Sequence, residues 1–287
     1  MLISNVALQL VGRPNNRLGI VLIKRAKVCL FIEWFRGYRR EMSGTIDVAF
    51  TPAGLRPVRL AVAVDVLRAS STIVAALDAG YRRVLCTASR GDAERLRAPG
   101  RLLAGERGCQ PIEGFDLGNS PSSLPPADGE DLVLCTTNGT PAILSALRVA
   151  EVVLVGSLTN LDAIAERIPR GEQTTIVCAG TDGCFALEDA YVAGRIVARL
   201  EGVRTDAAQA AERLAGAYIN PYDPLAQSAN AAVLRATGQA ADIEFCARES
   251  VSTAVPEAAL LPGQVAHIDI PLRKSAESFL EGFALPR

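Results

Sequence analysis

Histidine and lysine are nearly absent from the 287-residue chain, which has one histidine, His267, and three lysines, Lys24, Lys27 and Lys274. A Ser-His-Asp triad, a phosphohistidine mechanism and a multi-histidine metal site would each need imidazole groups. His267 lies in the strand-like stretch VAHIDI and is interpreted as a structural histidine. A P-loop is excluded because the pattern GxxxxGK[ST] does not occur. Carboxylates, arginines, hydroxyls and thiols are left to carry any chemistry.

Paired cysteines are also missing, since the seven cysteines include no CxxC motif and several lie inside apolar runs. This pattern favours reduced thiols in a cytoplasmic protein over a disulfide framework or a zinc site. A Cys-x5-Arg phosphatase is disfavoured because no cysteine is followed by arginine at that spacing. With 5% aromatic and 49% hydrophobic residues, the composition indicates a soluble globular chain with an aliphatic core.

Methionine occurs only at positions 1 and 42, and the chain before Met42 differs from the rest. Residues 1–41 carry eight Lys or Arg and two Glu, and basic residues interrupt their apolar stretch. That stretch predicts no membrane span and no membrane partner. We interpret residues 1–41 as a basic N-terminal extension outside the fold, and residues 42–287 as one α/β domain that begins at the natural start, Met42. A short basic amphipathic anchor is the alternative for the extension.

The remaining body is acidic, with 22 basic against 29 acidic residues after the extension is removed. An acidic body argues against nucleic acid as a partner. The sequence leaves the oligomeric state open, and a homo-oligomer is one candidate.

Apolar runs recur from Met42 onward, and most of them are followed by a helical pattern. Strands that are apolar on both faces and alternate with helices predict an α/β fold with a largely parallel sheet covered on both sides. The helix-rich region 181–250 and one long surface loop at 120–129 complete the pattern. The predicted strands are IDVAF (46–50), RLAVAVD (59–65), RRVLCT (82–87), RLLAGE (101–106), DLVLCT (131–136), EVVLVG (151–156) and TTIVCAG (174–180).

Polar residues follow four of these strands, where ligands bind in open α/β sheets. Each has a simpler interpretation: an internal salt bridge for Asp65 and Arg68, an N-cap for Ser70, and charges suited to a helix N-terminus for Glu188 and Asp189. Because four strand ends with such residues converge on one edge of the sheet, a ligand-binding site is favoured over four separate structural roles. The candidates are Asp65, Arg68, Ser70, Ser71 and Thr72; Glu106 and Arg107; Thr136, Thr137, Asn138, Gly139 and Thr140; and Asp182, Glu188 and Asp189.

The chemistry of this set points to a phosphate group and a hard cation. Carboxylates without histidine suit Mg²⁺, which prefers oxygen ligands. Arginines and helix N-termini suit an oxyanion, and the TTNGT stretch (136–140) places a polar turn before a predicted helix. A metal, arginines and backbone amides are together the groups that stabilise phosphoryl transfer.

Six motifs, in order, closely resemble the 2-phosphosulfolactate phosphatase family: VDVLRASSTI, GERG, GFDLGNSP, TTNGT, CAG and LEDAYVAG. The later stretch DIEFCARESVSTAVPEA also resembles the C-terminal region of that family, so the resemblance covers residues 45–260. It implies a three-layer α/β/α fold with a largely parallel or mixed sheet. It also implies a Mg²⁺-dependent phosphatase that hydrolyses 2-phospho-3-sulfolactate to 3-sulfolactate, a step towards coenzyme M.

From this resemblance and the strand ends we expect Asp65, Arg68, Glu106 and Arg107 to be catalytic. The expected Mg²⁺ ligands, directly or through water, are Asp65, Glu106 and Asp182. We expect Glu188 and Asp189 to contact and orient these ligands without binding the metal themselves. We expect the two hydroxyl and amide clusters to bind the substrate, namely Ser70, Ser71 and Thr72 and the residues Thr136, Thr137, Asn138, Gly139 and Thr140. The nucleophile stays open between a metal-bound water and Asp65 itself.

One departure from the family pattern follows the arginine of GERG, where Cys109 stands in place of a second glycine. A side chain there can narrow the pocket, which leaves the substrate open and affects the fold and reaction type less. Two alternatives to the function that the resemblance implies are kept. One is a Mg²⁺-dependent phosphatase for another small phosphorylated hydroxy acid, and the other is a non-catalytic protein that binds an anionic metabolite.

Overall fold

The computed structural model describes residues 44–271, so the predictions for residues 1–41 and for a start at Met42 lie outside the described part. Within that part the strands form one sheet in the order β5-β4-β6-β3-β11-β10-β7-β2-β8-β1-β9. The strands are β1 (Thr45–Ala49), β2 (Val58–Val64), β3 (Arg83–Thr87), β4 (Arg101–Arg107), β5 (Gln110–Pro111), β6 (Asp131–Cys135), β7 (Ala150–Gly156), β8 (Thr174–Cys178), β9 (Val203–Arg204), β10 (Glu257–Leu261) and β11 (Val265–Asp269).

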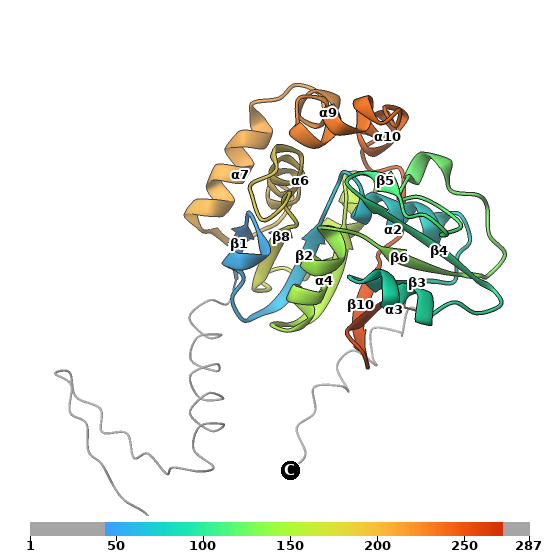
Figure 1. Cartoon of the computed structure of the whole chain (residues 1–287). Coiled ribbons are helices and arrows are strands. Elements are labelled where there is room, and N and C mark those ends of the chain that lie inside the picture. Colours follow the sequence, from blue (N-terminus) through green and yellow to red (C-terminus); the bar gives the residue numbers. More distant parts are fainter. Residues whose placement is uncertain (1–43, 272–287) are drawn as a thin grey trace, which may run out of the picture. The chain divides into compact units, whose positions relative to one another are not determined.

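Most of the α-helices connect strands of this sheet, and two short 3-10 helices lie in its loops (Figure 1). The α-helices are α2 (Ala69–Asp78), α3 (Arg90–Arg95), α4 (Gly139–Leu147), α5 (Leu161–Arg167), α6 (Leu187–Val197), α7 (Asp206–Gly216), α8 (Tyr222–Ala226), α9 (Ala229–Ala236) and α10 (Ala241–Cys246). The 3-10 helices are η1 (Pro52–Gly54) and η2 (Pro121–Ser123). No helix among residues 44–271 combines the length and the apolar character needed to span a bilayer.

The sheet is mixed, and each predicted strand corresponds to an observed one. Parallel pairing joins β4, β6 and β3 in one group and β7, β2, β8 and β1 in another. The antiparallel hairpin β10–β11 lies between these groups, paired with β7 on one side and β3 on the other. The stretch that contains His267 forms β11, where His267 pairs with Leu85. The sequence therefore predicted seven of the eleven strands in residues 44–271, and the hairpin, which was not predicted, links the two parallel groups.

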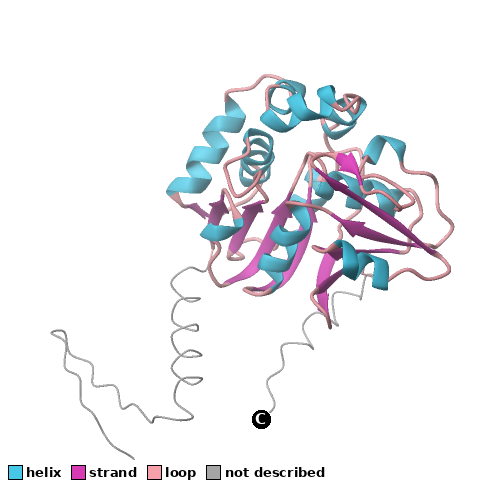
Figure 2. Ribbon diagram, in the orientation of Figure 1, coloured by secondary structure: helices cyan, strands magenta, loops and turns pink. Residues whose placement is uncertain are grey.

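Two apolar cores cover the two faces of the sheet, which confirms the predicted three-layer α/β/α fold (Figure 2). Successive side chains of a strand point to opposite faces. In β2, Leu60, Val62 and Val64 join the core beneath α5, α6 and α7. The intervening Ala61 and Ala63 join the core beneath α2 and α4. The run Leu60–Val64 of β2 is therefore apolar throughout, and the first polar residue at its carboxyl end is Asp65.

The helices α6 and α7 pack closely because a glycine faces the contact. A Cβ atom added to Gly194 of α6 would lie 2.0 Å from the carbonyl oxygen of Ala211 in α7. Only glycine therefore permits this approach. The chain continues from α7 through α8, α9 and α10, which we call the helical segment (residues 222–246). Hydrogen bonds described below fix this segment over the carboxyl ends of the strands.

Candidate active site

Asp65 directly follows β2, and residues 65–68, here called the Asp65 turn, lead into α2. Ser70 supports this turn from within the protein: its Oγ accepts from the N–H of Asp65 at 3.1 Å and donates to the carbonyl of Asp65 at 2.8 Å. Ser71 Oγ donates to the carbonyl of Val66 at 2.8 Å. Ser70, Ser71 and Thr72 are at most 1% exposed. The structure thus places the hydroxyls of Ser70 and Ser71 behind the turn, where they hold its backbone, whereas the buried hydroxyl of Thr72 has no hydrogen-bond partner among the described residues.

Arg68 is buried and forms its ion pair with Asp242 of α10, at 2.7 Å, rather than with Asp65. Its guanidinium also donates to Gln239 Oε1 and, at 3.2 Å, to the carbonyl of Cys109. The internal Asp65–Arg68 salt bridge, one of the simpler interpretations, is therefore replaced by a pair with a residue of the helical segment.

Glu106 lies near the end of β4 and joins two turns. Its Oε1 accepts from the N–H of Thr137 at 2.7 Å, and its Oε2 accepts from the N–H of Cys109 at 3.0 Å. Gly108 and Cys109 form the tight turn between β4 and β5, with φ angles of 57° and 64°. Such angles favour glycine, so Cys109 occupies a backbone conformation for which a second glycine is better suited.

The TTNGT turn (residues 136–140) is held from inside by its own hydroxyls. The N–H of Thr140 donates to Thr136 Oγ1 at 2.9 Å, and the two hydroxyls lie 3.0 Å apart. Thr136 thus accepts one of the free N–H groups in the first turn of α4, although the N-cap position itself is occupied by Asn138, whose side chain makes no capping bond. Thr137 is exposed and Asn138 is half-buried, so these two side chains reach the surface of the site.

Gly139 brings this turn against Asp65. A Cβ atom added to Gly139 would lie 2.5 Å from Asp65 Oδ2 and 2.4 Å from the Cβ atom of Ala69. Glycine therefore lets the N-terminus of α4 approach the carboxylate. Among residues 44–271, the N–H groups of Asn138 and Gly139 have no hydrogen-bond acceptor. Unpaired amides at the positive end of a helix are groups that can donate to an anion.

Arg107 is exposed and contributes a positive charge beside this place. Its guanidinium donates to the carbonyls of Glu106 at 2.6 Å and Ala88 at 2.9 Å, and to the sulfur of Cys135 at 3.1 Å. In the described part of the chain, no carboxylate forms an ion pair with Arg107. Carbonyl oxygens orient the guanidinium without cancelling its charge, so the charge is available to an anionic ligand.

The three acidic residues that follow β8 separate into one exposed and two buried groups. Asp182 is exposed, and its N–H donates to Asn138 Oδ1 at 3.1 Å, which links its loop to the TTNGT turn. Asp189 is buried and accepts from the N–H groups of Val66 at 2.9 Å and Gly180 at 3.0 Å. Asp189 therefore connects the Asp65 turn to the end of β8. Glu188 is also buried.

Burial raises the pKa values of Asp65, Glu188 and Asp189. Removal from water, followed by the negative charge of Glu106, raises the pKa of Asp65 to about 7. Removal from water and the charges of Asp65 and Glu188 raise the pKa of Asp189 well above its ordinary value. Burial likewise raises the pKa of Glu188. A perturbed pKa in a place with anion-binding amides is characteristic of functional sites.

The donor set fits a hard cation at Asp65 and Glu106. Their mutual repulsion would be relieved by a divalent cation, and Mg²⁺ is commonly held by one or two carboxylates together with substrate oxygens and waters. Asp182 is not drawn into a cluster with them: in the described range 44–271, no three Asp, Glu, His or Cys side chains converge in a way that could hold a metal. The structure therefore brings Asp65 and Glu106 into interaction, but it does not form a cluster of all three predicted ligands, Asp65, Glu106 and Asp182.

Residues of the helical segment complete the surroundings of the site, and they were not among the predicted site residues. Asn230 donates to the carbonyl of Leu67 at 3.2 Å, and Gln239 Nε2 donates to the carbonyl of Cys109 at 2.7 Å. Asp242 accepts the ion pair from Arg68. The only signal was the stretch DIEFCARES, which begins with Asp242 and carries part of the family resemblance.

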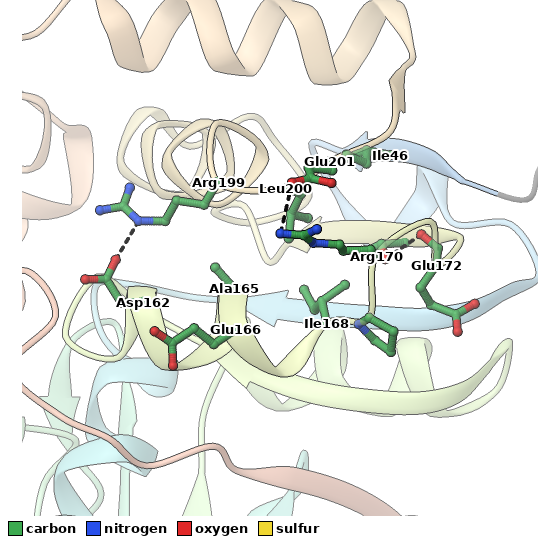
Figure 3. A pocket seen from close by; sticks show the side chains of 12 residues that line it. Ile46, Asp162, Ala165, Glu166, Ile168, Arg170, Glu172, Arg199, Leu200 and Glu201 are labelled. Atoms are coloured by element: carbon green, nitrogen blue, oxygen red, sulfur yellow. Dashed lines mark hydrogen bonds and ion pairs between the residues drawn. The ribbon is translucent and has the colours of Figure 1, made fainter. Parts of the chain in front are cut away.

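A separate cavity of about 370 Å³ lies away from this edge, between α5 and the C-terminal end of α6 (Figure 3). Two ion pairs join side chains of its lining, Arg199 with Asp162 at 2.6 Å and Arg170 with Glu201 at 3.5 Å. None of the predicted site residues lines it. The candidate site is therefore the carboxyl edge of the sheet.

Fold and site together describe an α/β protein whose carboxyl sheet edge carries two interacting carboxylates, an exposed arginine and the N-terminus of a helix. The sequence model of the 2-phosphosulpholactate phosphatase family matches residues 50–259, so the chain belongs to this family of phosphoric monoester hydrolases. It is 39% identical over 215 residues to a probable 2-phosphosulfolactate phosphatase of Thermotoga petrophila, an alignment that covers 74% of this chain and 94% of the relative.

Two further relatives agree with this assignment. A probable 2-phosphosulfolactate phosphatase of Thermus thermophilus is 40% identical over 202 residues, which cover 67% of this chain and 85% of the relative. The 2-phosphosulfolactate phosphatase of Methanothermobacter thermautotrophicus is 37% identical over 198 residues, which cover 69% of this chain and 85% of the relative. The resemblance inferred from six short motifs is thereby confirmed.

Proposed function

We propose that the chain is a Mg²⁺-dependent phosphatase that hydrolyses 2-phospho-3-sulfolactate to 3-sulfolactate and phosphate. One observation carries the proposal: the paired carboxylates Asp65 and Glu106, the unpaired amides at the start of α4 and the guanidinium of Arg107 meet at one edge of the sheet. The names of the aligned relatives support the substrate. The six cysteines of the described part are free, which supports a cytoplasmic enzyme on a route towards coenzyme M.

The charge of the substrate matches the charges of the site. Phosphate, sulfonate and carboxylate groups on three carbons carry up to four negative charges in the substrate. The unpaired amides of Asn138 and Gly139 would bind phosphate oxygens, and Arg107 would bind a second anionic group. When bound between Asp65 and Glu106, Mg²⁺ would neutralise charge on the transferring phosphoryl group. Glu106 holds the TTNGT turn in place through the N–H of Thr137.

Asp65 is the group proposed to handle the proton of the attacking water. In the metal-free protein, burial raises the pKa of Asp65 to about 7, and a bound Mg²⁺ would keep the carboxylate ionised, with one oxygen left to accept the proton. In this step the water oxygen bonds to phosphorus, a carboxylate oxygen of Asp65 takes the water proton, and the bond from phosphorus to the C2 oxygen breaks. The leaving oxygen then takes a proton and becomes the hydroxyl of 3-sulfolactate.

Phosphate release tests the proposal directly. Purified protein is assayed with 2-phospho-3-sulfolactate and with a panel of phosphorylated hydroxy acids, with Mg²⁺ and with a chelator. The proposal expects Mg²⁺-dependent release that is fastest with the sulfonated substrate. If only a different phosphorylated acid releases phosphate, that acid, rather than 2-phospho-3-sulfolactate, is the substrate. Binding of these acids without phosphate release would favour the anion-binding alternative. Release that persists in the chelator would overturn the metal requirement.

The configuration at phosphorus separates the two candidate nucleophiles. A phosphorothioate ester of the substrate, chiral at phosphorus through its oxygen isotopes, is hydrolysed in isotopically labelled water. Direct attack by water inverts the configuration, whereas attack by Asp65 followed by attack of water on the phosphorus of the aspartyl phosphate inverts it twice and retains it. Retention would replace the general-base role.

A further inference from the structure

Arg68 faces the helical segment rather than the mouth of the site. Its side chain and that of Asp242 are each 1% exposed, and they form an ion pair at 2.7 Å. The same guanidinium donates to Gln239 Oε1 and, at 3.2 Å, to the carbonyl of Cys109. A substrate could reach this guanidinium only by displacing a buried carboxylate. Such an exchange is unfavourable because it leaves the carboxylate buried without its partner.

Asp242 is itself fully occupied and joins three parts of the chain. Its Oδ2 accepts from Arg68, and its Oδ1 accepts from the hydroxyls of Ser120 at 2.7 Å and Ser122 at 2.5 Å. These serines belong to the loop that contains η2. One carboxylate therefore connects α10, this loop and the Asp65 turn.

A continuous series of hydrogen bonds leads from this carboxylate to the proposed anion site. Arg68 Nη2 and Gln239 Nε2 both donate to the carbonyl of Cys109, at 3.2 and 2.7 Å. The N–H of Cys109 holds Glu106 Oε2 at 3.0 Å, and Glu106 Oε1 holds the N–H of Thr137 at 2.7 Å. The orientation of Glu106, and with it that of the TTNGT turn, thus depends on contacts that begin at α10.

We propose that Asp242 is a positioning residue of the phosphatase site, which acts through Arg68 and Gln239 to fix Glu106 and the Asp65 turn. Arg68 is on this view a positioning residue as well, and it does not contact the substrate. The proposal rests on the proposed function for its kinetic test. The structural part of the proposal is testable without any substrate.

The kinetic test uses Asp242→Asn, Arg68→Gln and the double variant, each assayed per folded molecule. We expect kcat to fall about 10-fold or more in each variant while KM changes by less than about threefold, because transition-state geometry is lost and ground-state contacts are kept. The double variant leaves no unpaired charge buried, and we expect it to be no worse than the single ones. A double variant with wild-type kcat, or an Arg68→Gln variant with a strongly raised KM and normal kcat, would overturn the proposal.

Asp131→Asn is the matched control, since Asp131 is also a buried carboxylate held by arginines, but at the amino end of β6. This control is expected to lose stability and to keep its kcat. If Asp242→Asn does not fold, Gln239→Leu removes the bonds to Arg68 and Cys109 without leaving a new charge, and a decrease in kcat of about threefold or more is expected. Unchanged kcat in Gln239→Leu would contradict the proposal.

Hydrogen exchange provides the second readout. The amides of peptides that cover residues 106–111 and 136–140 are expected to exchange faster in Asp242→Asn and Gln239→Leu than in the wild type, and unchanged in Asp131→Asn. If the wild type releases no phosphate, the proposed function fails while this comparison still decides the coupling. Equal exchange in all variants would overturn the coupling, whatever the substrate.

Discussion

Two aspartates at opposite edges of the same sheet have opposite electrostatic surroundings. Asp65, at the carboxyl edge, lies among other acidic groups, and removal from water together with the charge of Glu106 raises its pKa to about 7. Asp131, at the amino end of β6, accepts hydrogen bonds from Arg82, Arg83 and Arg101. Burial by itself would raise the pKa of Asp131, but bonds from Arg83 and Arg82 lower it.

This difference separates a stabilising carboxylate from a functional one. Asp131 has its charge balanced by neighbouring side chains and holds three strands together. Asp65 has neighbours of its own sign, which costs folding free energy unless a cation binds. Groups that are costly to the fold but remain at the edge where ligands bind are candidates for chemistry.

Asp65→Asn should have the largest effect. Asparagine keeps the shape and one acceptor but loses the charge, so kcat should fall at least about 100-fold, or about 2.7 kcal/mol of barrier. The melting temperature without metal should stay the same or rise, because a repulsive charge is removed. Steady-state kinetics and thermal melts measure both. A variant that melts early but keeps near-normal turnover per folded molecule would make Asp65 structural.

Asp131→Asn should have the opposite profile. Three guanidinium groups would lose their shared carboxylate, and unfolding free energy should fall by about 2 kcal/mol, less than for a fully buried pair because Arg82 reaches solvent. Denaturant unfolding measures the loss, and kcat per folded molecule should not change. A loss of turnover equal to that of Asp65→Asn would remove the contrast between the two edges.

The pH dependence of stability should differ in sign between the two aspartates. The folded pKa of Asp65 is above its unfolded value, so the folded state binds more protons, and Asp65 makes the metal-free protein less stable as pH rises from about 4 to about 7. The folded pKa of Asp131 is lowered, so its stabilisation is present above its unfolded pKa and is lost as pH falls through the folded one.

Melts of the metal-free protein across this interval test the sign. Asp65→Asn should flatten the decrease between pH 4 and 7 by at least about 1 kcal/mol, whereas Asp131→Asn should remove stability only above the acidic range. A steeper decrease in Asp65→Asn would mean that its carboxylate is stabilised by the fold.

Arg107→Lys should weaken substrate binding moderately. Lysine keeps the charge but cannot form the two-pronged contact of a guanidinium, so KM should rise about five- to tenfold, or about 1 kcal/mol. Stability should be unchanged, because Arg107 is exposed and contacts carbonyl oxygens. Kinetics identical to the wild type would make Arg107 a surface residue and leave the anion site to the amides of α4.

Cys109→Gly should have the smallest effect. The φ angle of 64° favours glycine, but the half-buried thiol packs against the core, so the net change should be within about 1 kcal/mol. Phosphate release from the acid panel shows whether the smaller residue widens acceptance toward the sulfonated substrate. An unchanged profile would mean that the departure from the family pattern has no role in specificity.

Much of the fold was predictable because a strand buried on both faces has a recognisable sequence. LAVAV and LVLC have no polar residue, so β2 and β6 end where Asp65 and Thr136 begin. The ends of parallel strands share an edge, which is why the same residues predicted a site. The position of the β10–β11 hairpin between β7 and β3 was not predictable, since pairing between strands more than 100 residues apart leaves no local pattern.

By itself, the sequence determined the family, the three-layer fold and the edge of the sheet that carries Asp65, Glu106 and the TTNGT turn, because these depend on local apolar runs and ordered motifs. Only the tertiary structure decided which partner each side chain has. It turned the hydroxyls of Ser70 and Ser71 inward and paired Arg68 with Asp242, 174 positions away. The physical reason is that a buried guanidinium requires an acceptor at hydrogen-bond distance, and packing across the chain selects it.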